Sequence, residues 1–323
     1  MKRTLALVPT VALIGLGLGC GINVGDILPK TPPTQVKKLT SDGLHNIGGV
    51  ASSPDGETFY ALAFDDKSQP GVFRAKTSNG DVTPLFVGDP LLYPSDIAAS
   101  CDGEQVYVSD MGIGSAQTSE FAEDVAVTAM GGGIHVINTD SGERSNLEAT
   151  GILRAAGLVL STDCETLYVT GWTEGGAPAL FTVPADGGSA TVVAEGAPLL
   201  SPTGVHVDEN NIAWVMDHLA RGDNGEGMLF AINEDGDVSE VVSGLDMGRH
   251  GGVSLTPGGT TAVIPVRNDL TGDSSLITAN TETMDVEIIE TPDIPHPTGV
   301  AAARNAPVMV VAGEYGLHIA TFE

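Results

Sequence analysis

Pro202-Thr203-Gly204-Val205 opens one of six similar stretches along this chain. Each stretch has a small or polar residue, then a glycine or a substitute for it, then a hydrophobic run. The other five stretches are Gly48–Val50, Ser95–Ile97, Ala156–Leu158, Gly251–Val253 and Thr298–Val300. The last residues of successive stretches are 47, 61, 47, 48 and 47 positions apart. Units of β type that repeat with a period in the forties are typical of a β-propeller. The sequence therefore predicts one domain with six blades.

The residues after each stretch predict the rest of a blade. Turns rich in Gly, Pro, Asp and Ser, such as Ser53–Gly56, separate segments rich in β-branched and aromatic residues, such as Phe59–Phe64. The turn residues supply the backbone angles of tight reversals, and the β-branched and aromatic residues favour strands. We therefore expect an all-β fold, a six-bladed β-propeller with four-stranded blades.

The two ends of the chain predict how the ring closes. The sixth blade has three candidate strands before Glu323, and the segment Gln35–Thr40 precedes blade 1 without a partner. We expect this N-terminal strand to join the last blade, which makes residues 34–323 the propeller and removes open sheet edges. The 61-residue spacing is explained by an insertion in blade 2, at Ile113–Met130.

The N-terminus predicts export. A basic start at Met1–Arg3 is followed by an apolar run from Leu5 to Leu18, which is too short for a membrane-spanning helix. Because Cys20 follows Gly19, the segment resembles a bacterial lipoprotein signal, whose cysteine is acylated after cleavage. Residues 1–19 would then be the signal peptide and residues 20–33 a lipid-anchored tether. The alternative is an ordinary secretion signal with an incidental cysteine.

Localisation and partners follow from this signal and from the charge. Gly21 after the cysteine suits the outer membrane under the rules of that resemblance, so we expect an exported protein anchored at the bacterial outer membrane or cell surface. The formal net charge is −28 at pH 7, which repels nucleic-acid phosphates and anionic lipids. We expect no nucleic-acid partner, membrane contact only through the anchor, and a monomer. The alternative interpretation of the charge is solubility alone.

The two remaining cysteines predict a disulfide. Cys101 and Cys164 both fall in the first hairpin turn of neighbouring blades, blades 2 and 3. Exported proteins favour disulfides. The alternative is two isolated thiols, because the tips of adjacent hairpins need not reach the α-carbon separation that a disulfide requires.

Polar side chains gather at one predicted face, which we call the top face. It carries the loops that enter the innermost strands and the loops that leave the second strands. Polar and titratable groups that converge at one mouth of a fold are the first candidates for a site. The catalytic candidates are His250 and His296. The ligand-binding candidates are His45, Asn46, Asp96, Asp110, Arg154, Asp217, His218, Arg249 and Asp269.

Structural roles are open alternatives for these residues. Each histidine could be solvated or bonded locally, and Asp110 and Asp217 could make turn hydrogen bonds. His135 and His318 fall at the third-strand position that Phe73, Phe181 and Phe230 hold in other blades, so we expect them between blades. His206 lies on an innermost strand and faces either the central channel or the next blade.

The openings Pro202–Val205 and Pro297–Val300, and the second-strand pairs Tyr107-Val108 and Tyr168-Val169, resemble the NHL-repeat and gluconolactonase (regucalcin-like) group of six-bladed propellers. The resemblance covers about Gln35–Glu323. It implies a divalent metal, often calcium, on the axis and hydrolysis of lactones or esters. The group's glutamate, asparagine and aspartate ligands are replaced here by His45–Gly48, Thr203 and Arg249-His250, so no full ligand set carries over.

These observations predict an extracytoplasmic lipoprotein propeller that acts as a ligand- or protein-binding scaffold. Its partner would be a small molecule or a protein at the top face. The alternative is a metal-dependent lactonase or esterase of the gluconolactonase type, with its site on the top-face axis, His250 or His296 as the base and a divalent metal such as calcium. No Gly-x-Ser-x-Gly or His-Glu-x-x-His motif is present in the sequence.

Overall fold

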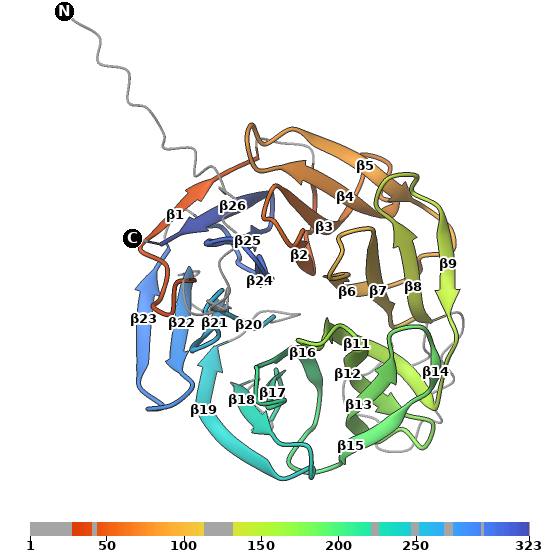
Figure 1. Ribbon diagram of the computed structural model, residues 1–323, viewed down its shortest axis with the longest axis vertical. Helices are drawn as coiled ribbons and strands as arrows, with labels where there is room; N and C mark the ends of the chain where they lie inside the picture. The colour runs from red at the N-terminus through yellow and green to blue at the C-terminus, as the bar shows by residue number, and fades with distance from the viewer. Residues whose placement is uncertain are drawn as a thin grey trace, which may run out of the picture.

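Six antiparallel four-stranded sheets stand around a central axis in the computed structural model (Figure 1). The structure describes residues 28–40, 44–112, 132–220, 226–246, 252–267, 274–291 and 294–322. Within these ranges the elements are all strands, and none is a helix that could cross a membrane. The prediction of an all-β, six-bladed propeller is confirmed.

The strands of the first three blades are given from the axis outwards. Blade 1 contains β2 (Val50–Ser52), β3 (Thr58–Phe64), β4 (Pro70–Lys76) and β5 (Val82–Val87). Blade 2 contains β6 (Pro94–Ala99), β7 (Gln105–Asp110), β8 (Gly133–Asn138) and β9 (Arg144–Leu147). Blade 3 contains β11 (Ile152–Leu160), β12 (Thr166–Thr173), β13 (Pro178–Pro184) and β15 (Thr191–Glu195). The short strands β10 (Ala149–Thr150) and β14 (Gly188–Ser189) pair beside blade 3.

The other three blades repeat this order. Blade 4 contains β16 (Pro202–Val207), β17 (Ala213–Asp217), β18 (Glu226–Ile232) and β19 (Val238–Asp246). Blade 5 contains β20 (Ser254–Leu255), β21 (Thr261–Arg267), β22 (Ser274–Asn280) and β23 (Val286–Glu290). Blade 6 contains β24 (Val300–Ala302), β25 (Val308–Gly313), β26 (Gly316–Thr321) and, as its outermost strand, β1 (Gln35–Lys38).

Strand β1 closes the ring, as predicted. It pairs antiparallel with β26, from Gln35 opposite Thr321 to Lys38 opposite His318. The residues just before β1 also belong to the propeller. Leu28 is buried, and the backbone N–H of Gly258 in blade 5 donates to the carbonyl of Pro29 at 2.8 Å. The end of the expected tether therefore lies against a hairpin of blade 5.

The repeated glycine of the six stretches is required by crowding at the axis. A β-carbon on Gly49 would lie 2.6 Å from the Cα of Asp96, and one on Gly157 would lie 2.2 Å from the carbonyl oxygen of Thr203. Side-chain carbon atoms do not come this close to backbone, so the innermost strands of neighbouring blades can approach only where the side chain is missing.

The hydrophobic core lies between neighbouring blades. One cluster joins Tyr168 and Leu180 of blade 3 to Val205 and Phe230 of blade 4. Full burial of a side chain such as Phe230 contributes about 1.5–3 kcal/mol. His135 and His318 occupy the predicted positions between blades and are 4% and 3% exposed. They pair with Val108 and Val311, as Phe181 pairs with Val169.

The face opposite the top face, which we call the bottom face, carries the first hairpin turn of each blade. Cys101 and Cys164 form a disulfide there, with their Cα atoms 6.0 Å apart. Three of these turns contain the same hydrogen bond. The hydroxyl groups of Ser53, Ser100 and Ser161 each donate to an aspartate two residues later, at 2.6, 2.6 and 2.5 Å. These hydrogen bonds lower the pKa of the aspartates, as at Asp102.

Candidate functional site

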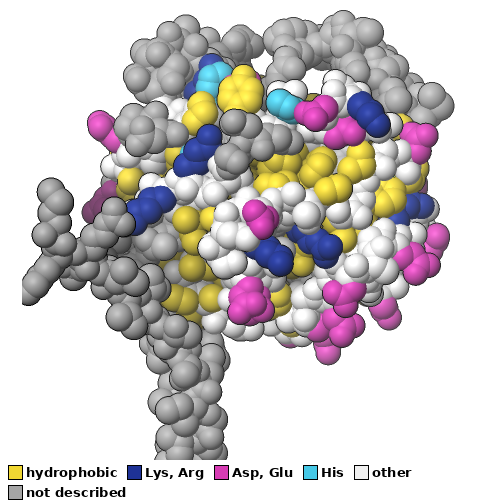
Figure 2. Space-filling view, turned by 90° about the horizontal axis from the view of Figure 1, so that it is seen from above, with side chains coloured by type: hydrophobic (Ala, Val, Ile, Leu, Met, Phe, Trp, Pro, Cys, Tyr) yellow, Lys and Arg dark blue, Asp and Glu magenta, His cyan; other side chains and the backbone are white. Residues whose placement is uncertain are grey.

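The top face contains a pocket of about 550 Å³, which we call the top-face pocket. Blades 1, 2, 5 and 6 contribute to its wall. Phe64, Leu62 and Ala63 provide apolar surface, and the polar lining residues are Asn46, Tyr93, Ser95, Arg267, His296, Thr298 and Glu314. Figure 2 shows the molecule edge-on, with histidine side chains near its upper edge, acidic side chains beside one of them, and further acidic side chains over the rest of the face. The pocket thus combines apolar walls with a few hydrogen-bonding groups.

His296 and Glu314 form a pair in this pocket. His296 Nδ1 lies 3.2 Å from Glu314 Oε2, and the two side chains are 39% and 25% exposed. The hydroxyl group of Tyr315 donates to Glu314 Oε1 at 2.7 Å. When the Nδ1 proton of His296 points at the carboxylate, Nε2 keeps its lone pair. This arrangement can orient an imidazole so that it accepts a proton from a bound molecule.

The backbone at two pocket residues adopts an unusual conformation. Asn46 has a φ of 49° and His296 a φ of 50°, both in the left-handed region. Residues other than glycine pay about 1–3 kcal/mol there, and such residues concentrate at binding and active sites. His296 stands between Pro295 and Pro297, which restrict the chain further. The fold therefore holds these two side chains in positions that a relaxed loop would not give them.

His45 lies on the rim rather than in the pocket wall. Its Nε2 is 3.5 Å from Asp66 Oδ1, and the two side chains are 49% and 91% exposed. The backbone of His45 forms a β-bridge with Phe64, the last residue of β3. This bridge brings the next residue, Asn46, to the pocket.

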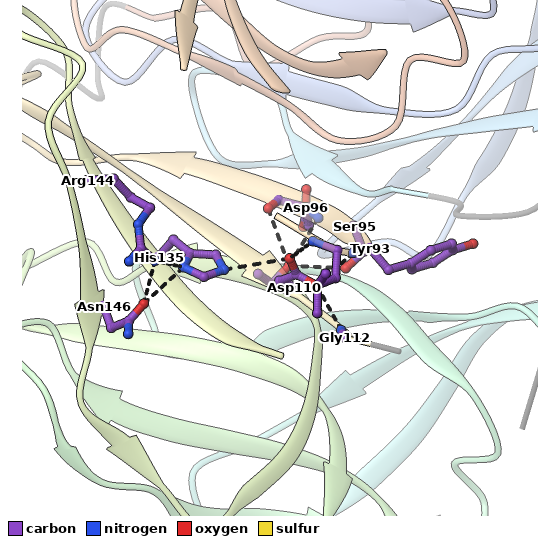
Figure 3. Close-up of polar contacts among 10 residues, drawn as sticks. Tyr93, Ser95, Asp96, Asp110, Gly112, His135, Arg144 and Asn146 are labelled. Atoms are coloured by element: carbon purple, nitrogen blue, oxygen red, sulfur yellow. Dashed lines mark hydrogen bonds and ion pairs between the residues drawn. The ribbon is translucent and has the colours of Figure 1, made fainter. Parts of the chain in front are cut away.

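Asp110 and Asp217 support the loops of the top face instead of lining the pocket. Asp110 accepts hydrogen bonds from the backbone N–H groups of Leu92, Tyr93 and Gly112 at 2.7, 2.9 and 2.8 Å (Figure 3). Asp217 does the same in blade 4. Its donors are Leu200, Ser201 and Leu219, at 2.7–3.1 Å. Both carboxylates are fully buried, and each fixes the chain just before an innermost strand.

The pKa values of these two carboxyl groups are shifted in opposite directions. Burial raises the pKa of Asp110, but His135 and the three N–H groups outweigh it, so the pKa lies below its ordinary value. His135 Nε2 is 3.6 Å from Asp110 Oδ2, and Arg144 and Asn146 contact His135 Nδ1 at 2.6 and 3.1 Å (Figure 3). Burial also raises the pKa of Asp217, and there the N–H groups and His218 do not outweigh it.

The remaining candidates do not line the top-face pocket. Asp96 lies on the axis below it, and its carboxylate accepts from the N–H groups of Ile97 at 2.9 Å and Leu158 at 3.1 Å. Burial raises the pKa of Asp96 to about 7. Arg154 stacks on Trp172, 5.3 Å from the ring centroid. His218 Nδ1 contacts the carbonyl of Ser201 at 3.1 Å. Arg249, His250 and Asp269, like Cys20, lie outside the described residues.

Tyr93 lines the pocket although the sequence pattern did not single it out. It precedes Pro94 as His296 precedes Pro297, so an alignment of the blade openings would have placed both side chains at the same loop position. That alignment is the signal that could have found it.

The described residues do not fit the metal set that the family resemblance implies. No three His, Cys, Asp or Glu side chains among them come together as a metal site requires. Asn46 lies in the pocket, Thr203 stands in the place of an amide ligand, and residues 249 and 250 lie outside the described ranges.

Comparison with known proteins supports the fold. The structure is similar to XC5397 from Xanthomonas campestris, described as a gluconolactonase, with a TM-score of 0.61, 14% identity, and coverage of 92% of this chain and 99% of that one. It is similar to the nidogen/laminin complex, with a TM-score of 0.60, 17% identity and coverage of 80% and 85%. For TolB from Acinetobacter baumannii the TM-score is 0.55, with 13% identity and coverage of 76% and 55%.

No protein-family model and no curated protein sequence matches the chain. At these identities the structural similarities show the fold and nothing more. The architecture is therefore established as a six-bladed β-propeller with gluconolactonase- and nidogen-containing structures among its neighbours.

Proposed function

We propose that this protein is a binding module that holds a small polar molecule in the top-face pocket. The observation that carries the proposal is the pocket itself, whose volume of about 550 Å³ falls in the range of small-ligand sites, roughly 300–1,000 Å³. The aromatic rings of Phe64 and Tyr93 offer flat apolar surface. Asn46, His296 and Glu314 offer hydrogen bonds of fixed direction, as small-ligand sites do.

Calorimetry with a panel of monosaccharides, sugar acids and sugar lactones tests this proposal. We expect at least one member to bind, and Asn46→Ala and Glu314→Gln to weaken it by roughly tenfold each, the effect of one lost hydrogen bond to a buried or charged partner. Gln105→Ala, which changes an exposed side chain on the other face, is the control. Binding that all three variants leave unchanged would place the ligand elsewhere.

A second candidate function is hydrolysis of a lactone or ester, favoured by the His296–Glu314 pair. His296 Nε2 would take a proton from water as the water attacks the carbonyl carbon, and Glu314 would hold the imidazole in the required tautomer. The tetrahedral intermediate would then break the acyl C–O bond, and His296 would pass the proton to the leaving alkoxide, which yields the acid and the alcohol. The resemblance to the gluconolactonase group supports this candidate.

Turnover of aryl esters and δ-lactones, with and without calcium, zinc or manganese, separates the two functions. Under the hydrolytic candidate, His296→Ala loses about 10²–10⁴-fold in rate, as expected for a general base. Loss of turnover in His250→Ala but not in His296→Ala would assign the base to the other histidine. No turnover of any substrate would leave the binding role as the function.

We further propose that the protein is exported and lipid-anchored through Cys20. The apolar N-terminal run and the Cys101–Cys164 disulfide support this, because disulfides persist in oxidising compartments. Cys20→Ala should release the protein into soluble fractions or leave its precursor uncleaved. A variant that stays with the membrane and is processed normally would contradict the anchor.

A further inference from the structure

The innermost strands enclose a second cavity of about 280 Å³ along the axis, which we call the axial cavity. It begins beneath the top-face pocket at Ser95 and Thr298 and ends among the hairpin turns of the bottom face. Most of its wall is backbone or small side chains. At one level the six strands contribute Ala51, Ala98, Val159, His206, Ser254 and Ala301. The other five positions hold alanine, serine or valine, so His206 departs from the repeat. The packing of the innermost strands does not require a histidine there.

His206 faces this cavity, which answers the question that the sequence left open. Its neighbours Val205 and Val207 belong to the hydrophobic cluster between blades 3 and 4, and all three residues contribute to the cavity wall. Because successive side chains of a strand point to opposite faces, His206 points away from that cluster. The side chain makes no hydrogen bond to any other residue that the structure describes. Burial and the charge of Arg304 lower the pKa of His206 to about 4. The imidazole is therefore neutral at pH 7, with one N–H donor and one acceptor directed at the cavity.

Arg304 closes the lower end of the cavity. It lies in the hairpin turn after β24 of blade 6 and reaches blade 3 on the opposite side of the ring. Its guanidinium donates to the carbonyl oxygens of Thr162, Leu160 and Ser161 at 3.2, 3.3 and 3.3 Å. These bonds fix the group across the axis. They use three of its five N–H donors.

The charge of Arg304 is not neutralised at short range. In the described part of the chain no carboxylate lies within ion-pairing distance of the guanidinium. Burial lowers the pKa of Arg304, and the more distant Asp163 offsets this only in part. An arginine stays ionised in proteins, and a partly buried charge held only by carbonyl groups is an unfavourable arrangement. An anion at the lower end of the cavity would relieve it.

We propose that the axial cavity binds a small organic carboxylate, with its carboxylate group on Arg304 and His206. A guanidinium with free N–H groups matches a carboxylate in geometry and charge, and His206 adds a neutral donor. A volume of about 280 Å³ equals roughly nine water molecules, which exceeds a single inorganic ion. The small apolar side chains above His206 suit an organic body.

Calorimetry of the mature protein with succinate, glutarate and benzoate, against sodium chloride at equal ionic strength, tests the proposal. We expect one molecule to bind per chain. Arg304→Gln should weaken binding by roughly tenfold or more, since it removes a charge-assisted pair, and His206→Ala by roughly tenfold. Lys76→Gln, which removes an exposed positive charge from β4, is the matched control and should bind as the unchanged protein does.

Two further readouts keep the test decisive. Arg304 also joins blades 6 and 3, so thermal unfolding of Arg304→Gln must be measured beside binding. His206→Ala gives the position the residue that blades 1, 2 and 6 have there, and it tests the site without that complication. Absence of binding beyond the chloride control, or binding that His206→Ala leaves unchanged, would overturn the proposal. If only Glu314→Gln lost binding, the bound ligand would lie in the top-face pocket, and this result would also overturn the proposal.

Discussion

Blades 2 and 4 contain the same loop, and in each an aspartate binds it. The pKa of this aspartate is lowered in blade 2 and raised in blade 4. In both blades a Gly-x-Pro-Leu-Leu-x-Pro segment, 88–94 or 196–202, leads to the innermost strand, and an aspartate at the end of the second strand binds its backbone N–H groups. In blade 2 the third strand carries His135, which lies near Asp110. In blade 4 the same register of the third strand is occupied by Phe230. His135 thus contributes to the lowered pKa of Asp110, and blade 4 has no histidine in that register.

The comparison shows that a repeat can preserve a structural role while its electrostatics vary. Asp110 and Asp217 both hold a chain segment by hydrogen bonds to backbone, and in both the acceptor is a buried carboxylate. His135 and the backbone N–H groups outweigh the effect of burial on the pKa of Asp110, whereas His218 and the backbone N–H groups do not outweigh it for Asp217. Blade 2 also carries Tyr93, which lines the top-face pocket, so the better-supported carboxylate stands beneath the candidate site.

The largest expected effect comes from removal of either carboxylate. Asp110→Ala and Asp217→Ala each leave three backbone N–H groups without an acceptor, and we expect each to lower the free energy of unfolding by roughly 3–5 kcal/mol. The loss should be greater for Asp110→Ala, because His135 also loses its partner. Chemical denaturation measures both, with Asp55→Ala in an exposed turn as a milder control. Equal losses would mean that His135 contributes nothing.

An intermediate effect is expected when blade 2 is given the residue of blade 4. His135→Phe removes the histidine that lowers the pKa of Asp110, so this pKa should rise above its value in the unchanged protein. We expect a loss of about 1 kcal/mol at pH 7, because the variant also loses the hydrogen bonds of His135 Nδ1 with Arg144 and Asn146. NMR titration of the carboxyl carbon of Asp110 gives the pKa. A pKa that falls or stays the same would contradict the assigned cause.

The smallest expected effect is a difference in pH dependence between the two loops. The lowered pKa of Asp110 contributes stability that is present above its unfolded value of 3.8 and is lost as the pH falls through the folded pKa. The raised pKa of Asp217 contributes stability that is present below 3.8 and is lost as the pH rises through its folded pKa.

Hydrogen exchange, corrected for intrinsic rates, can follow this difference at the amides of Leu92 and Tyr93 and at those of Leu200 and Ser201. Between pH 7 and pH 4 we expect protection to increase in blade 4 and to stay level in blade 2. Below pH 3.8 protection should decrease in blade 2. The same trend in both blades would show that the two carboxyl groups titrate alike.

The fold was predictable from the sequence because the axis imposes one requirement on every blade. Innermost strands come closest where a glycine stands, so a glycine recurs with the blade period in every blade except blade 2, which has Asp96 there, and Gly49 and Gly157 show the crowding. The closing strand was predictable because Gln35–Lys38 had one unpaired sheet to join. What the pattern did not reveal is that Leu28 and Pro29 belong to the propeller, since one buried leucine and one backbone hydrogen bond leave no periodic signal.

The candidate site was less predictable because loop conformation decides where each side chain points. Strand direction placed Asn46, Asp110 and His296 at one face of the ring. The positive φ values of Asn46 and His296 turn those residues into the pocket, whereas backbone N–H groups hold Asp110 in its loop. Neither effect depends on residue type alone. The spacing before the repeated proline marks Tyr93 and His296, but it does not show that Asn46 lines the pocket and that Asp110 supports a loop.

The closing strand also determines how the molecule responds to mechanical load. A pull on the N-terminal segment acts first on the contacts of Pro29 and Lys30 with blade 5. It then acts along β1, whose hydrogen bonds to β26 resist as a group because the force runs parallel to the strand. Strand β26 continues from the hairpin that carries Glu314. Tension at the N-terminus is therefore borne by blades 5 and 6 and reaches the wall of the top-face pocket directly.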